Sequence, residues 1–92
     1  MANVTRDEVQ QIVFKLLAEQ SGPLVEGDQL WVKHDLSRDL DIDDVGMVNA
    51  VLDLEYTLHI VIDDDAKAGF GTVGQVLDYC CDQLKKQGRL SA

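Results

Sequence analysis

The amino-acid sequence predicts an all-α domain, a four-helix bundle of three long helices and one short helix with a long first connection. Three observations predict it. Apolar residues recur at helical spacing in three separate stretches, a capping pattern precedes each stretch, and the one proline, Pro23, falls between the first two. The 92 residues suffice for one hydrophobic core but not for two, so we expect residues 1–92 to form a single domain.

The first helix is expected over residues 5–20. Thr5 and Glu8 have the spacing of a capping box, in which each side chain bonds the backbone N–H of the other residue. Pro23 follows the helix end because proline disfavours helical backbone in the residue before it. The expected inner face consists of Val9, Ile12, Val13, Leu16 and Leu17.

The connection over residues 21–42 is rich in apolar side chains. A long loop of this composition is expected to lie across the helices and cover their core. Trp31 either belongs to that cover or is an exposed contact residue, and the sequence leaves both interpretations open. The apolar residues of this connection are Leu24, Val25, Leu30, Trp31, Val32, Leu36 and Leu40.

The second helix is expected from Asp44 to Leu58, with Asp43 as its N-cap. Its apolar stripe is wide, which is typical of a helix that packs on more than one neighbour. The stripe consists of Val45, Met47, Val48, Val51, Leu52, Leu54 and Leu58.

Residues 59–71 connect this helix to the last one. The run Ile60–Ile62 has strand propensity, but no partner strand is evident, so we expect a buried connection. A short helix is expected from Asp63 to Ala68, because aspartates favour a first helical turn, and Gly69 would end it.

The last helix is expected to begin at Thr72, which forms a second capping-box pattern with Gln75. We expect Cys80 in the core and Cys81 on the surface, because neighbouring residues on a helix point about 100° apart. The predicted inner face consists of Val73, Val76, Leu77, Cys80 and Leu84.

The charge of the chain is strongly negative, with a formal net charge of -9 at pH 7. This argues against nucleic acid and anionic membrane surfaces as partners, because phosphate contacts need lysine and arginine. No stretch is apolar enough to span a membrane, and residues 1–4 lack the pattern of a signal peptide, so we expect a cytoplasmic monomer.

Acidic residues concentrate between positions 39 and 65, where nine occur without a lysine or arginine. This segment is either a solvated helix face or a docking surface for basic proteins, to which negative charge would steer partners. The residues predicted to contact a partner are Asp39, Asp41, Asp43, Val45, Met47, Val48, Asp53 and Glu55.

The sequence predicts neither a metal site nor an enzyme. A calcium-binding EF-hand loop starting at Asp39 would need glycine and glutamate where Asp44 and Ala50 stand. His34 and His59 lie in no recognisable catalytic context, and no nucleophile stands beside a base.

Residues Leu36–Tyr79 resemble the acyl carrier proteins. The family motif Asp-Leu-Gly-x-Asp-Ser-Leu corresponds to residues 39–45, which read Asp-Leu-Asp-Ile-Asp-Asp-Val. Asp41 therefore replaces the motif glycine, Asp44 the serine, and Gly46 a residue that is usually polar. Further similarities are the Leu-Glu pair Leu54 and Glu55, the segment Ile62–Asp64, the helix start Phe70–Val73, and Asp78 with Tyr79.

The resemblance implies a four-helix fold and, in ordinary members, a serine that carries 4'-phosphopantetheine. An aspartate at position 44 lacks that hydroxyl, so no cofactor is expected on this chain. The preferred interpretation is a carrier-like interaction module that binds partners such as acyl-transfer, fatty-acid or polyketide enzymes. The alternatives are a genuine acyl carrier of such a pathway with an altered attachment site, and an unrelated helical adaptor. Whether the aspartate is natural or engineered stays open.

Overall fold

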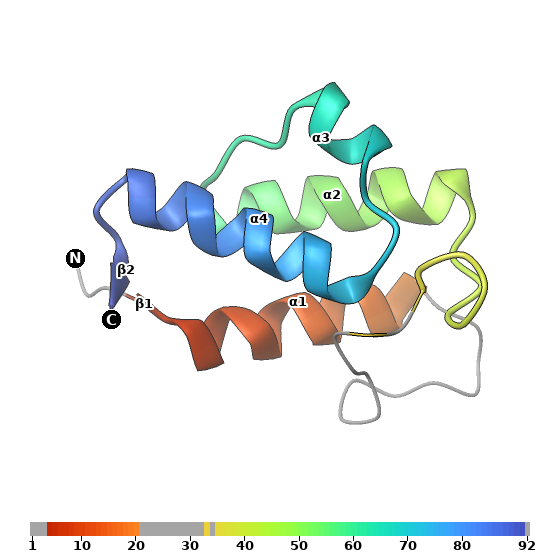
Figure 1. Ribbon diagram of the computed structural model, residues 1–92, viewed down its shortest axis with the longest axis horizontal. Coiled ribbons are helices and arrows are strands. Elements are labelled where there is room, and N and C mark those ends of the chain that lie inside the picture. Colours follow the sequence, from red (N-terminus) through yellow and green to blue (C-terminus); the bar gives the residue numbers. More distant parts are fainter. Residues whose placement is uncertain (1–3, 21–32, 34, 92) are drawn as a thin grey trace.

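Four helices account for most of the computed structural model, which describes residues 4–20, 33 and 35–91 (Figure 1). The predicted all-α, four-helix fold with three long helices and one short helix is confirmed. The helices are α1 (Arg6–Gln20), α2 (Asp44–Leu58), α3 (Asp64–Ala68) and α4 (Val73–Lys86). Two short strands, β1 (Val4–Thr5) and β2 (Leu90–Ser91), lie at the two ends of this order.

The long helices lie side by side, and α1 packs against both α2 and α4. In Figure 1, α2 and α4 run in the same direction and α1 runs in the opposite one. The short helix α3 lies in the connection between α2 and α4, above the layer of long helices in this view.

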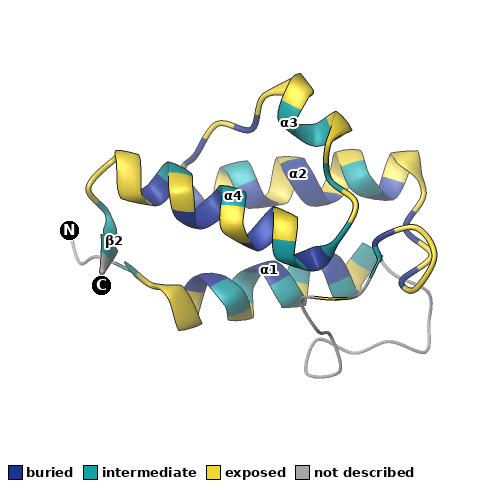
Figure 2. Ribbon diagram, viewed as in Figure 1, coloured by how far each residue is buried: buried dark blue, intermediate teal, exposed yellow. Residues whose placement is uncertain are grey.

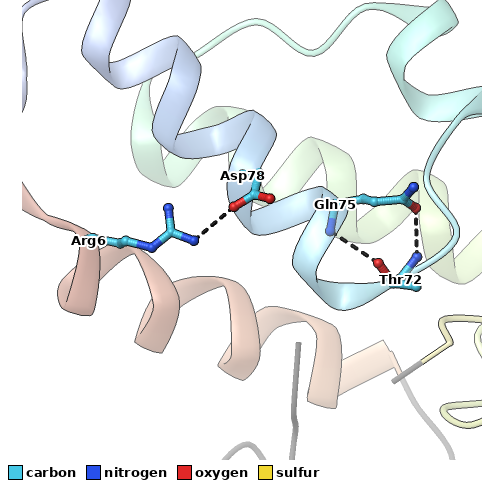
Figure 3. A network of polar contacts seen from close by, with 4 residues as sticks. All are labelled: Arg6, Thr72, Gln75 and Asp78. Carbon is cyan, nitrogen blue, oxygen red and sulfur yellow. Dashed lines mark hydrogen bonds and ion pairs between the residues drawn. The ribbon is translucent and has the colours of Figure 1, made fainter. Parts of the chain in front are cut away.

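Local side-chain chemistry sets where the helices begin. The hydroxyl of Thr5 accepts the backbone N–H of Glu8 at 3.2 Å, and the Glu8 carboxylate accepts the N–H of Thr5 at 3.2 Å. Thr72 and Gln75 make the same reciprocal pair at the start of α4 (Figure 3). Both predicted capping boxes are thus confirmed, and each satisfies two backbone donors that the first turn leaves unpaired.

Aliphatic side chains of α1, α2 and α4 form the hydrophobic core. The ribbon in Figure 2 shows buried and exposed residues alternating along each of these helices. Ile60 and Ile62 are buried and Val61 is exposed, so residues 60–62 form the predicted buried connection and not a strand. Leu36 and Leu40 of the first connection also join the core. The predictions for Leu24, Val25, Leu30, Trp31 and Val32 fall outside the described residues.

Two predictions about side-chain placement are wrong. The wide stripe of α2 was expected to pack on more than one neighbour, but Leu52 is exposed, and so are Val45 and Val48, which were also predicted to contact a partner. Cys81 was expected on the surface and is buried like Cys80. Burial raises the pKa of both thiols, that of Cys80 to about 12.

The C-terminal residues close the fold by linking α2 to the first strand. Gly88 adopts a positive φ of 71°, and the N–H groups of Gly88 and Arg89 bond the carbonyls of Lys85 and Leu84 at 3.0 and 2.8 Å. This pattern ends a helix with a sharp reversal. The reversal brings β2 beside β1, with which it pairs in parallel.

Arg89 follows that reversal and reaches the C-terminal end of α2. Its Nη1 donates to the carbonyls of Leu58 at 2.7 Å and His59 at 3.2 Å. The side chain of Gln87 donates to the same His59 carbonyl at 3.2 Å. We call residues 87–91 the C-terminal clasp, because they hold the end of α2 and the beginning of the chain together.

Candidate docking site on helix α2

Asp44 is the first residue of α2 and is exposed to solvent. The residue before it, Asp43, caps the helix, because its Oδ1 accepts the backbone N–H of Gly46 at 2.7 Å. The predicted N-cap and helix bounds are therefore confirmed. Asp44 thus stands at the positive end of the α2 dipole, where a carboxylate is favoured.

The segment before α2 alternates between core and solvent. Leu40 and Ile42 are buried, whereas Asp39, Asp41 and Asp43 are exposed. The two apolar side chains anchor the segment in the core, and the three carboxylates consequently gather on the outside. This places three predicted docking residues close to the start of α2.

Asp41 has a positive φ of 55°. This left-handed conformation favours glycine, and aspartate is one of the few other residues that adopt it at modest cost. At this place in the segment an aspartate therefore adopts the conformation that favours glycine, and its carboxylate adds a negative charge to the outer surface.

A hydrogen-bonded turn at residues 35–39 supports this segment. Asp35 Oδ1 accepts the N–H groups of Ser37 at 2.9 Å and Arg38 at 2.8 Å, and these bonds hold the pKa of Asp35 below its ordinary value. Asp39 Oδ2 accepts the N–H of Asp35 at 2.7 Å, so Asp39 is also engaged in the turn. The N–H of Leu36 donates to the carbonyl of Gly71 at 2.9 Å, which fixes the turn to the beginning of α4.

A cavity of about 790 Å³ opens beside Asp44, between the 35–37 turn, the first half of α2 and α3. Its apolar lining includes Met47, Val48 and Phe70. Lys67 is the one cation of this lining within the described residues, and it pairs with Asp64 at 3.0 Å. The predicted contact residues Met47 and Val48 therefore lie at the wall of a hollow next to Asp44.

An exposed apolar row continues from this hollow along α2. The row consists of Val45, Val48, Leu52 and Tyr56, whose exposed fractions are 68%, 46%, 57% and 83%. These positions are separated by three, four and four residues, which places them on one face of the helix. Leu52 and Tyr56 were not among the predicted docking residues, although this spacing in the sequence would have identified them.

Asp53 and Glu55 flank the row differently. Asp53 is exposed, as a docking residue would be. Glu55 is half-buried, and its Oε2 accepts the backbone N–H of Ile62 at 3.0 Å. Glu55 therefore holds the connection after α2 in place, and its carboxylate is less available to a partner than that of Asp53.

The described part of the chain was searched for grouped metal ligands and for membrane-spanning helices. Within residues 4–20, 33 and 35–91, no three His, Cys, Asp or Glu side chains are grouped in a way that would hold a metal ion. Among the helices of these residues, none is long and apolar enough to cross a membrane.

Comparison with solved structures finds a known protein with a similar fold. No protein-family model and no curated protein matches the chain. Among solved structures, the chain is similar to the acyl carrier protein from Enterococcus faecalis, with a TM-score of 0.73 and 30% sequence identity. The similarity covers 87% of this chain and 99% of that one.

Proposed function

Since the chain belongs to the acyl carrier protein family, we propose that it is a carrier-like interaction module that holds no prosthetic arm. In this proposal α2 docks basic surfaces of partner proteins, and the chain catalyses no reaction of its own. Its partners would be cytoplasmic proteins such as acyl-transfer, fatty-acid or polyketide enzymes.

The observation that carries the proposal is the position of Asp44. Family members attach 4'-phosphopantetheine through a serine hydroxyl at the start of the second helix, and the resemblance over residues 39–45 aligns Asp44 with that serine. A carboxylate does not supply the hydroxyl from which this phosphodiester forms. Asp44 is exposed, so its chemistry, and not its burial, is what would prevent attachment.

Ser37 is the serine nearest to Asp44 in the sequence, and it is a poor substitute for the missing hydroxyl. Ser37 is exposed, but it lies before the segment that precedes α2. Its backbone N–H is bonded to Asp35 in the turn at residues 35–39. An arm attached to Ser37 would leave from this turn and not from the start of α2.

The fold tolerates an aspartate at position 44. A carboxylate in the first turn of a helix gains roughly 0.3 to 1 kcal/mol from the helix dipole. Repulsion from Asp41 and Asp43 opposes this gain, but these carboxylates are exposed and screened by water and salt. The scaffold and its docking face are thus retained while the attachment chemistry is lost.

The proposal is tested by incubating the protein with coenzyme A and a broad-specificity phosphopantetheinyl transferase. We expect the intact mass to stay that of the bare chain. Covalent phosphopantetheine on any residue of the wild-type chain would overturn the proposal and favour a genuine acyl carrier with an altered attachment site.

Asp44→Ser provides the matched positive control for this experiment. We expect it to gain one phosphopantetheine group, because Asp39, Leu40 and Asp43 keep much of the motif around the new serine. Asp44→Ala should fold and stay unmodified. A folded Asp44→Ser variant that stays unmodified at high transferase concentration would show that the surface around α2 no longer fits carrier-protein enzymes.

A further inference from the structure

Helix α3 has a hollow on each side. The cavity beside Asp44 lies against one side of it, and a second cavity of about 650 Å³ lies against the other, over the exposed side of α4. Lys67 and Ala68 of α3 line the first cavity, whereas Asp65 and Ala66 line the second. We call the two cavities the Asp44 hollow and the α4 hollow.

Phe70 follows α3 and is the one described residue that lines both hollows. Its side chain is half-buried. We infer that the ring of Phe70 is a movable partition, which turns toward one hollow or the other. An apolar group that fills the α4 hollow then narrows the Asp44 hollow, and the reverse also holds. This conformational device goes beyond the proposed docking of partners and does not depend on it.

The backbone on either side of Phe70 is held by hydrogen bonds. The N–H of Phe70 donates to the carbonyl of Lys67 at 3.2 Å, and the carbonyl of Gly71 accepts the N–H of Leu36 at 2.9 Å. The N–H of Gly71 donates to Oε1 of Gln75 at 2.6 Å. Movement of Phe70 is therefore expected as rotation of the side chain between staggered rotamers, and not as a displacement of α3.

The ring of Phe70 meets that of Tyr79 edge to face, with the ring centres 5.6 Å apart and an angle of 73° between the planes. Tyr79 is fixed at its outer end, because its hydroxyl donates to the carbonyl of Val61 at 3.3 Å and accepts the N–H of Asp63 at 3.4 Å. Phe70 has no side-chain polar atom that could fix its ring in the same way. Tyr79 is thus a fixed wall of the α4 hollow, and Phe70 is the side chain that turns.

Both hollows have apolar walls against which the ring can rest. Met47 lines the Asp44 hollow, and Ala66 and Leu90 line the α4 hollow. A group that occupies one hollow excludes the ring from it and shifts the population toward the other rotamer. Energetic coupling between two sites requires an element of this kind, whose equilibrium both sites bias. The occupancy of the α4 hollow consequently alters the shape of the surface at the start of α2.

Two alanines of α3 allow a matched test of this inference. Ala66 lines the α4 hollow and Ala68 lines the Asp44 hollow, and leucine is nearly as good a helix former as alanine. Ala66→Leu should fill the α4 hollow and turn the ring toward Met47. Ala68→Leu should fill the other hollow and turn the ring toward Tyr79.

Nuclear Overhauser effects from the Phe70 ring measure its position. The chain has two phenylalanines and two methionines, so ring and ¹³C-methyl signals are few and are assigned by single substitutions. We expect the effect between the Phe70 ring and the Met47 methyl group to be stronger in Ala66→Leu than in the wild type and lost in Ala68→Leu. The effect between the Phe70 and Tyr79 rings should change in the opposite sense. Amide spectra show whether each variant is folded.

Phe70→Ala removes the partition and tests whether the ring carries the coupling. In the wild-type background, Ala66→Leu should shift the signal of the Met47 methyl group, and in the Phe70→Ala background this shift should be lost. Equal shifts in both backgrounds would show that α3 transmits the change, which would overturn the inference. Ring contacts that are the same in the two leucine variants, or that change in the same direction in both, would also overturn it. If Phe70→Ala does not fold, the ring contacts of the two leucine variants decide by themselves.

Discussion

Gly46 allows the first turn of α2 to approach its neighbours closely. A Cβ atom at this position would lie 3.0 Å from Ile42 Cγ2, 3.2 Å from Asp43 Oδ1 and 3.6 Å from Gln20 Cβ. Ile42 is buried, and the Asp43 carboxylate is the one that caps α2. The absence of a side chain at residue 46 thus serves both the core packing and the cap at the start of α2.

Gly46→Ala should destabilise the protein. Alanine has a better helix propensity than glycine by about 1 kcal/mol, but overpacking a well-filled site costs typically about 1–3 kcal/mol. Because Ile42 is branched and buried and Asp43 must keep its hydrogen bond, we expect a net loss of about 1 kcal/mol in the free energy of unfolding, measured by urea denaturation.

Gly69→Ala is the control for this substitution. Its Cβ would lie 3.6 Å from the carbonyl oxygen of Ala66, an ordinary contact, and its φ is -90°. This variant should be as stable as the wild type or slightly more so. A Gly46→Ala protein that is more stable than the wild type would show that Ile42 and Asp43 shift at little cost to make room for the added methyl group.

At the scale of elements, the turn at residues 35–39 depends on the ionised Asp35 carboxylate. Its pKa is lower in the folded protein than the usual 3.8, mainly because the N–H groups of Arg38 and Ser37 bond it. A depressed folded pKa stabilises the protein above the unfolded pKa, and this contribution is lost as pH falls through the lower folded value.

Asp35→Asn tests this contribution, because asparagine resembles the protonated carboxyl group. The variant should be less stable than the wild type near neutral pH, and the difference should shrink as pH falls below about 4. Urea denaturation of both proteins across this range measures it. A difference that stays constant down to about pH 3 would mean that the charge of Asp35 does not support the turn.

The start of each long helix is predictable from the sequence, because caps depend on neighbouring residues only. Thr5 with Glu8, Asp43, and Thr72 with Gln75 all act as their spacing indicates. The segment that leads into α2 is also recognisable by its resemblance to the family motif, which led directly to Asp44.

The side on which an element packs is less predictable. The wide apolar stripe of α2 does not tell which part of it faces α1, so Leu52 was expected in the core and Tyr56 was not recognised as part of the exposed apolar row. Cys80 and Cys81 are adjacent on α4 and point about 100° apart, yet both are buried. The pairing of β1 with β2 involves two residues from each strand, too few for any periodicity to indicate.

At the scale of the whole molecule, Asp44 and the C-terminal clasp lie at opposite ends of α2. Asp44 and the hollow beside it lie at the first turn, and the C-terminal clasp holds the last turn. The ion pair of Arg6 with Asp78 at 2.8 Å also joins α1 to α4 (Figure 3), but both side chains are exposed and such pairs contribute little.

Arg89→Ala should lower the free energy of unfolding by about 1–3 kcal/mol, because it removes charge-assisted hydrogen bonds to two carbonyls at the end of α2. Lys86→Ala, an exposed cation in the last turn of α4, should change it by less than about 0.5 kcal/mol. Urea denaturation of both variants measures the two losses in the free energy of unfolding. Equal losses would mean that the hydrogen bonds of Arg89 stabilise the fold no more than the charge of any C-terminal cation does.

The same substitution should not affect chemistry at the other end of the molecule. When Arg89→Ala is combined with Asp44→Ser, we expect transferase modification at the rate of Asp44→Ser alone, provided that both proteins are folded at the assay temperature. A slower rate in the folded double variant would show that the clasp influences the start of α2.

The parallel pairing of β1 with β2 also determines how the molecule is tethered. Val4 lies opposite Leu90 and Thr5 opposite Ser91, at the end of the bundle away from the first turn of α2 (Figure 1). A fusion partner joined before β1 or after β2 would therefore leave from nearly the same point. Immobilisation through either end should present Asp44 outward and leave α2, the proposed docking helix, unobstructed for surface-based capture of partners.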